Sequence, residues 1–175
     1  IAAAKNDNSG SLSNGFLMRM PGYVALMKKR NKTKKEIATA SILDTKLTHS
    51  HLETFHLAVI YSQILSNAID GLSANDIFTW LKGVIRDSKV KSELIVSIVQ
   101  SIEKNQDYIM YNNKKYLYSA LDHKYIGFIG YSIWIAIKAM LEFTSYDRAM
   151  IYVASLGGDT DTNCCITGAI IGALY

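Results

Sequence analysis

Residues 157–163 read Gly157-Gly158-Asp159-Thr160-Asp161-Thr162-Asn163, and residues 164–175 continue as the apolar run CCITGAIIGALY. The two glycines permit a tight backbone turn, and the polar residues after them stand where a helix would begin. Gly168 and Gly172, each followed by an alanine, leave one side of that helix nearly without side chains. A neighbouring helix can therefore approach closely, and the stretch predicts a central, buried helix that is entered from a tight turn.

The same turn carries a group of oxygen ligands. Asp159, Asp161 and the hydroxyl of Thr162 fall on the first turn of the predicted helix, and Mg²⁺, Mn²⁺ and Ca²⁺ prefer such hard oxygen ligands. The alternative, which spacing alone favours, is that Asp159 caps the helix and Asp161 complements its dipole. Cys164 and Cys165 diverge by about 100° on a helix, so we interpret them as packing residues that do not bridge each other.

The rest of the chain also has a helical pattern. Pro21 is the only proline, and apolar residues recur at three- and four-residue intervals with almost no strand-like alternation. The segment 105–121 is rich in Tyr, Asn and Lys without a clear period, and we expect a loop-rich connection there. At 175 residues and 49% hydrophobic content, the chain is expected to form one all-α domain over residues 1–175.

Several helix starts can be located from local signals. Thr33 with Glu36, and Ser50 with Glu53, have the spacing of capping boxes. Core-facing apolar stripes are expected after two of the starts. Further N-cap candidates are Ser73 and Ser145, and the stripes comprise Leu52, Phe55, Val59 and Ile60, then Ile77, Leu81, Val84 and Ile85.

A second polar cluster, Gly10-Ser11-Leu12-Ser13-Asn14-Gly15, leads into Phe16-Leu17-Met18-Arg19. Backbone amides in a Gly/Ser-rich loop before a helix form a natural cradle for phosphate, and Asn14 can bond hydroxyls or carbonyls. The same composition is also typical of an ordinary connection. Arg19 is expected at the surface or in an ion pair, and His49 at the start of a helix, facing a ligand or water.

Charge and hydropathy exclude two kinds of partner. The net charge of +4 comes largely from lysines and an arginine within residues 28–35, where no aromatic residues are interleaved to stack bases, so we expect no nucleic acid. The longest apolar stretch, residues 128–137, is shorter than the roughly 20 residues of a membrane-spanning helix. With no basic-then-apolar leader at its start and no cysteines placed to bridge, the chain is expected to be cytoplasmic and free of membrane contacts.

Taken in order, these segments resemble the ADP-ribosylglycohydrolase family, which includes the dinitrogenase-reductase-activating glycohydrolase and J1 crystallins. Residues 10–19 are similar to the family's G-S-x-x-N-G-x-x-M-R segment, residues 48–49 to its T-H step, and residues 157–162 to its G-G-D-T-D-T signature. Residues 127–131, before a helix through Trp134 and Leu141, are similar to its glycine-containing lead into a penultimate long helix. The resemblance implies the C-terminal half of a multi-helix, all-α bundle that lacks its N-terminal helices.

The resemblance also implies a function, the hydrolysis of the bond between ADP-ribose and a modified protein side chain or small molecule. It implies two ions, usually Mg²⁺ or Mn²⁺, in a cleft that binds the distal ribose, with Asp159, Asp161 and Thr162 as the ligands from this half. The front loop would hold the diphosphate or ribose, and a histidine would reach the substrate from the head of its helix. The residues so placed at the substrate are Gly10, Ser11, Asn14, Gly15 and His49.

Two departures from the family pattern limit this expectation. The glycine-rich, acidic first helix and the Thr-Asp-Asp-type ligand segment of the family do not occur in these residues, and Leu12 stands where some relatives place an aromatic that stacks on adenine. We therefore expect a fragment, which is a processed chain, a split gene product or a remnant. Its catalytic groups would lie in a complementary N-terminal segment, so that the chain alone is silent and exposes apolar surface. The alternatives are a crystallin-like structural protein and an ADP-ribose-binding module, and the acceptor of ADP-ribose stays open.

Overall fold

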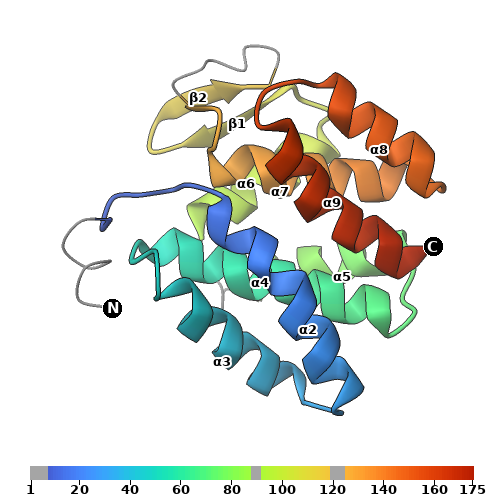
Figure 1. Ribbon diagram of the computed structural model, residues 1–175. Coiled ribbons are helices and arrows are strands. Elements are labelled where there is room, and N and C mark those ends of the chain that lie inside the picture. The colour runs from blue at the N-terminus through green and yellow to red at the C-terminus, as the bar shows by residue number, and fades with distance from the viewer. Residues whose placement is uncertain (1–7, 88–91, 119–124) are drawn as a thin grey trace.

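A computed structural model describes residues 8–87, 92–118 and 125–175 (Figure 1). Within these ranges the chain is almost entirely helical, which confirms the predicted all-α class. None of the described helices is long and apolar enough to cross a membrane. The elements are η1 (Gly15–Arg19), α2 (Met20–Lys29), α3 (Lys34–Thr45), α4 (Leu52–Ile69), α5 (Ala74–Arg86), α6 (Glu93–Glu103), β1 (Tyr108–Tyr111), β2 (Lys114–Leu117), α7 (Ile129–Glu142), α8 (Tyr146–Ser155) and α9 (Thr160–Leu174).

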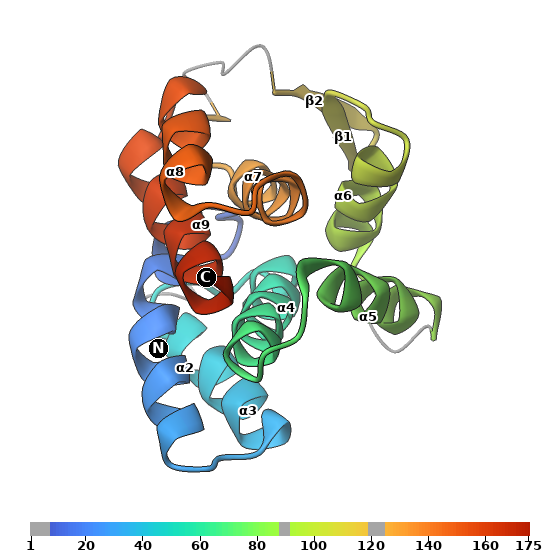
Figure 2. The same cartoon turned by 90° about the vertical axis from the view of Figure 1, so that its right-hand side faces the viewer.

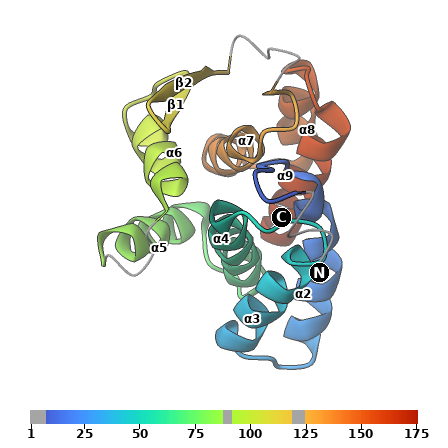
Figure 3. The same cartoon turned by 90° about the vertical axis from the view of Figure 1, so that its left-hand side faces the viewer.

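The helices form three layers. In Figure 2, α4 and α7 lie in the middle, with α8, α9 and α2 on one side and the hairpin, α6 and α5 on the other; Figure 3 shows the same order from the opposite direction. The middle helices are buried along most of their length, including all of residues 60–68 in α4 and 129–137 in α7. A helix that is apolar on nearly every side belongs in the core of a domain, which explains their place.

Two of the four side-chain caps at the predicted starts are confirmed. Thr33 Oγ1 accepts from the Glu36 amide at 3.2 Å while the Glu36 carboxylate accepts from the Thr33 amide at 2.8 Å, which completes a capping box. Ser73 caps α5 by accepting from the amide of Asp76. Ser145 occupies the N-cap position of α8, but its side chain makes no capping hydrogen bond.

The capping box predicted for Ser50 and Glu53 is wrong. The N-cap of α4 is His51, whose Nδ1 accepts from the Glu53 amide at 3.2 Å. The Glu53 carboxylate is buried and accepts a hydrogen bond from the hydroxyl of Ser92, which caps α6. Glu53 therefore links the starts of two helices that are far apart in sequence.

The predicted apolar stripes are only partly buried. Ile60, Ile77 and Leu81 lie in the core, but Leu52 is 63% exposed. Leu52 belongs to the first turn of α4, where the helix emerges from the bundle, so its burial was wrongly predicted. The half-buried members of the two stripes are Phe55, Val59, Val84 and Ile85.

The segment expected to be loop-rich contains a short antiparallel hairpin, so that prediction is wrong for residues 108–117, whereas 119–121 lie outside the described residues. Tyr108 pairs with Leu117 and Tyr111 with Lys114. The turn residues Asn112 and Asn113 have φ angles of 48° and 57°. Positive φ at both central residues is the requirement of a two-residue type I′ turn, which asparagine tolerates.

Helix α9 is buried on one side only. The predicted close approach is confirmed, because a Cβ at Gly168 would lie 3.2 Å from Tyr146 Oη and 3.3 Å from Met150 Sδ of α8. Asp161, Cys165 and Gly172 are exposed, so the prediction of a central, buried helix is wrong for α9. Both cysteines are free, as predicted; Cys164 is half-buried, but Cys165 is exposed and is not a packing residue.

Candidate functional site

The candidate site forms where the front loop meets the segment before α7. The Asn14 amide donates to the Gly127 carbonyl at 2.9 Å, and the Ile129 amide donates to the Leu12 carbonyl at 2.8 Å. These bonds flank an isolated antiparallel bridge between Ser13 and Phe128. Segments more than a hundred residues apart are thereby fixed side by side, close to the start of α9.

The Asn14 side chain connects this loop to both α7 and α9. It is 4% exposed, and its Nδ2 donates to Asp159 Oδ2 at 2.7 Å and to Ser132 Oγ at 2.9 Å. The Ser132 hydroxyl in turn donates to Asn163 Oδ1 at 2.7 Å. Ser132 and Asn163 were not predicted site residues. The available signal was their polarity inside apolar runs, since buried polar groups require partners.

Asp159 does not cap α9 with its side chain. It occupies the N-cap position, but no capping hydrogen bond forms from the carboxylate, so the capping interpretation of this residue is wrong. Asn14 orients the carboxylate instead, and Gly127 lies beside it, where a Cβ would be at an ordinary contact distance of 3.8 Å from Asp159 Oδ2. A carboxylate at a helix N-terminus that is not used for capping is available to another cation or donor.

Two further oxygen donors share the first turn of α9. Asp161 is exposed and makes no hydrogen bond or ion pair with any described residue, whereas Thr162 is 6% exposed. The described part of the chain contains no group of three or more His, Cys, Asp or Glu side chains that could hold a metal ion. By donor chemistry, Asp159, Asp161 and Thr162 therefore fit a hard divalent cation, but they supply only part of its coordination shell.

His49 is buried against the loop and does not project from the head of α4. It is 5% exposed, and its Nε2 lies 2.7 Å from Ser13 Oγ while its Nδ1 lies 2.9 Å from Thr48 Oγ1. Burial, and then the positive charge of Arg19, lower the pKa of this imidazole. His49 is thus a neutral ring near pH 7 that positions Ser13, and Arg19 forms the expected ion pair, with Asp44 at 3.0 Å.

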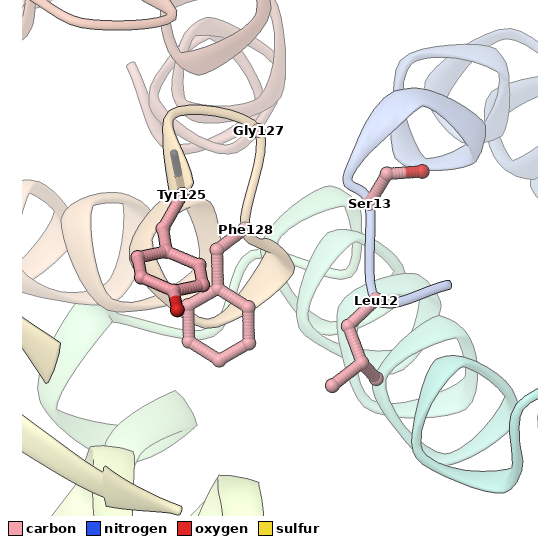
Figure 4. Close-up of a pocket in the computed structure, with 5 residues that line it drawn as sticks. All are labelled: Leu12, Ser13, Tyr125, Gly127 and Phe128. Atoms are coloured by element: carbon pink, nitrogen blue, oxygen red, sulfur yellow. The ribbon is translucent and has the colours of Figure 1, made fainter. Parts of the chain in front are cut away.

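A pocket of about 260 Å³ opens beside the loop, lined by Leu12, Ser13, Tyr125, Gly127 and Phe128 (Figure 4). The rings of Tyr125 and Phe128 lie together on one side and Leu12 on the other, while the hydroxyl of Ser13 points away from the rings. Phe128 is fixed by Tyr116 of β2, whose ring stacks on it with centroids 4.4 Å apart. Aromatic surface therefore comes from the segment before α7, at a place where the loop itself offers only Leu12.

The predicted substrate residues are divided between the surface and the interior. Gly10 is exposed and Gly15 half-buried, and the Ser11 hydroxyl donates to Ser13 Oγ at 3.2 Å. The backbone amides of Gly10 and Leu12 donate no hydrogen bond to a described residue. The loop thus has two amides without a partner among the described residues, whereas Asn14 and His49 are engaged in internal hydrogen bonds.

An all-helical fold with this loop and acidic turn matches one known family. The family model of ADP-ribosylglycohydrolase matches residues 2–175, and the chain belongs to this family. It is 39% identical over its whole length to a protein of Acanthamoeba polyphaga mimivirus that is provisionally named an ADP-ribosyl glycohydrolase. It is 26% identical over 99% of its length to human ADP-ribosylhydrolase ARH3, and 25% identical to the mouse protein of that name. In each case the chain spans about half the length of the relative that it matches.

Proposed function

We propose that this chain supplies metal ligands and the substrate-binding loop of an enzyme that hydrolyses the glycosidic bond between ADP-ribose and a modified protein side chain or small molecule. The observation that carries the proposal is the state of Asp159. Its carboxylate is held by a buried asparagine and is not used to cap its helix. A carboxylate that is oriented in this way at the start of a helix can serve as an oxygen ligand for a hard cation.

Asp159, Asp161 and Thr162 would contribute oxygens to a site for two Mg²⁺ or Mn²⁺ ions. Such a pair orients water and stabilises the charge that develops when a glycosidic bond breaks. Other residues of this chain position the Asp159 carboxylate. Asn14 fixes the direction of Asp159, and Ser132 and Asn163 fix Asn14, so the carboxylate does not need to be ordered when a cation arrives.

The substrate would lie along the front loop. The amides of Gly10 and Leu12, which have no partner among the described residues, suit the diphosphate, because backbone N–H groups in such loops bind anions. The pocket between Leu12 and the rings of Tyr125 and Phe128 suits the adenine base. His49 bonds the hydroxyl of Ser13 and holds it away from the pocket, so its role is to shape the loop beside the base and not to contact the base.

The remaining ligands and the catalytic base are proposed to come from a segment outside residues 1–175. Support comes from the partial set of oxygens on α9 and from the share of about half of each relative that the chain spans. An ADP-ribose-binding module without turnover is the second candidate. It is favoured by the fact that the loop and pocket lie within this chain, whereas the oxygen ligands are only a partial set.

The test is an assay for release of ADP-ribose from ADP-ribosylated protein, with and without Mg²⁺ or Mn²⁺. The chain alone is expected to be silent, and the chain combined with its complementary segment is expected to turn over only with metal. Turnover by the isolated chain at the rate of a complete family member would refute the shared site. ADP-ribose binding by the combined, metal-loaded protein without any turnover would favour the binding module.

A further inference from the structure

The hairpin of β1 and β2 presents one side of β2 to the segment before α7. Side chains two residues apart on a strand point the same way, so Lys114 and Tyr116 share that side. The Tyr116 ring stacks on the Phe128 ring, with centroids 4.4 Å apart and an angle of 18° between the planes. It also meets the Tyr125 ring edge-on, with centroids 5.5 Å apart. One residue of the hairpin therefore contacts both of the aromatic rings that line the pocket.

Lys114 and α7 add further contacts to these two rings. The Lys114 ammonium donates a hydrogen bond to the Tyr125 hydroxyl and lies 3.7 Å from the centroid of that ring, where the ring quadrupole attracts a cation. Tyr131 of α7 meets the Phe128 ring edge-on, with centroids 5.4 Å apart. Phe128 is 6% exposed, so its neighbours decide the orientation of its ring. Both pocket rings are therefore held by side chains that do not line the pocket.

The position of the hairpin is in turn fixed by α6 and α7. The Met110 amide donates to Ser97 Oγ of α6 at 2.7 Å. Ile109, which lies opposite Tyr116 in the register, is 1% exposed and packs where Gly130 of α7 has no side chain. A shift of the register by one residue would turn every side chain of β2 to the other side. These contacts therefore also decide that Tyr116 faces the pocket rings.

We propose that Tyr116 is a positioning residue, which sets the affinity of this pocket for a nucleotide base by fixing the rings of Tyr125 and Phe128. Aromatic rings attract one another in stacked or edge-on arrangements, and binding is stronger when the receiving ring does not have to be ordered first. Tyr116 is not among the residues that line the pocket (Figure 4), so it acts through the two rings. This inference rests on the proposed function, which places the base in this pocket.

AMP is a suitable probe, because it carries the base and one phosphate but lacks the distal ribose that the metal site would bind. Its binding to the chain without metal is measured as a Kd by titration, and as magnetisation transfer from the protein to the ring protons of adenine by NMR. Tyr116→Leu removes the stacked ring. We expect AMP to bind about tenfold more weakly, with less transfer to the adenine protons, since a base–aromatic stack is worth roughly that factor. Tyr116→Phe keeps the ring and should bind AMP like the parent.

Tyr108→Leu is the matched control. Tyr108 lies on β1 opposite Leu117, and the Lys115 ammonium is 4.0 Å from the centroid of its ring. Because side chains alternate along a strand, this ring lies on the other side of the hairpin from Tyr116. The substitution therefore disturbs the hairpin without removing the stack on Phe128, and AMP should bind as in the parent. If Tyr116→Leu is unfolded at the assay temperature, Tyr116→Met replaces it, because the flexible methionine side chain fills irregular gaps.

Two results would overturn the role of Tyr116 and leave the base pocket in place. AMP could bind Tyr116→Leu as tightly as the parent, or Tyr108→Leu could lose the same affinity, which would assign the loss to the hairpin as a whole. Failure of the parent chain to bind AMP would instead overturn the base pocket of the proposed function together with this inference. A loss that occurs in Tyr116→Leu, is absent in Tyr108→Leu and is restored in Tyr116→Phe supports the proposal.

Discussion

At the scale of single residues, Asn14 joins three separate parts of the chain. Its side chain bonds Asp159 and Ser132, and Ser132 bonds Asn163. Every member except Asp159 is buried. Buried polar groups that lose a partner pay their full desolvation cost, so the network stabilises the fold as well as the direction of the carboxylate.

Ser132→Ala tests this network. The substitution leaves Asn163 Oδ1 without its donor, and we expect the free energy of unfolding in denaturant to fall by about 1–3 kcal/mol. Ser155→Ala, which removes an exposed hydroxyl bonded to the carbonyl of Tyr152, is the control and should stay within about 0.5 kcal/mol of the parent. Equal losses in the two variants would show that the buried network contributes nothing specific.

His49 predicts a dependence of stability on pH. Its pKa in the folded chain is lowered, by burial and then by Arg19, so the unfolded chain binds the proton more tightly. The contribution is complete above the ordinary histidine pKa of about 6.5 and is lost as the pH falls through that value. The thermal midpoint should therefore drop between about pH 7 and pH 5, and His49→Gln should flatten that part of the curve. An unchanged slope in His49→Gln would assign the drop to other groups.

The residue types at the site could be predicted from the sequence, but several of their roles could not. Asp159 and Asn14 stood out because they follow or precede glycines in short polar segments. Their mutual hydrogen bond spans 145 residues, and no local pattern encodes such a contact. For the same reason His49, expected to face a ligand or water, is instead bonded to Ser13.

At the scale of elements, α7 is held closely at its first turn. A Cβ at Gly130 would lie 2.5 Å from the Phe128 ring and 2.6 Å from Ile109 Cδ1. Gly130 thus lets the hairpin and the segment before α7 meet, which also places Phe128 beside the pocket.

Two glycine-to-alanine substitutions in helices should have opposite effects. Gly130→Ala overpacks the junction and should lower the free energy of unfolding by about 1–3 kcal/mol. Gly83→Ala meets no atom within 4 Å and should raise it by up to about 1 kcal/mol, because alanine is the better helix former. Denaturant titration of both variants checks the signs, and a stabilising Gly130→Ala would show that the junction is looser than described.

Local sequence signals predicted a helix start correctly where the contacts that stabilise that start are also local. The Thr33–Glu36 box formed as expected because both partners lie within one turn. The same spacing failed for Glu53, which pairs with Ser92 across 39 residues. The hairpin was missed because strands of four residues show almost no alternation, although Asn112-Asn113 is a recognisable turn signal.

At the scale of the whole molecule, the candidate site lies at the start of α9, where the outer layer of α2, α8 and α9 meets the segment before the middle helix α7. Asp161 lies in the first turn of α9 and is exposed, with no hydrogen-bond or ion-pair partner among the described residues. The all-α class followed directly from the apolar spacing. The partial exposure of α9 did not, because glycines and alanines on a helix indicate close packing on one side without indicating whether the other sides are covered.

The measurement that tests the central claim most directly is the response of Asp161→Asn to Mn²⁺, in the chain combined with its complementary segment. Asparagine keeps the size of the side chain but removes the charge that a hard cation requires. Without metal, only a dipole interaction of about 0.3–1 kcal/mol is lost, so the thermal midpoint should barely change. The Mn²⁺-induced rise of the midpoint should disappear, and hydrolysis should fall by orders of magnitude.

Asp147→Asn makes the same change in the first turn of α8 and should keep both the Mn²⁺ response and the activity. If Asp161→Asn retains full hydrolysis and an intact Mn²⁺ shift, Asp161 is not a metal ligand and the proposed metal site on α9 is contradicted.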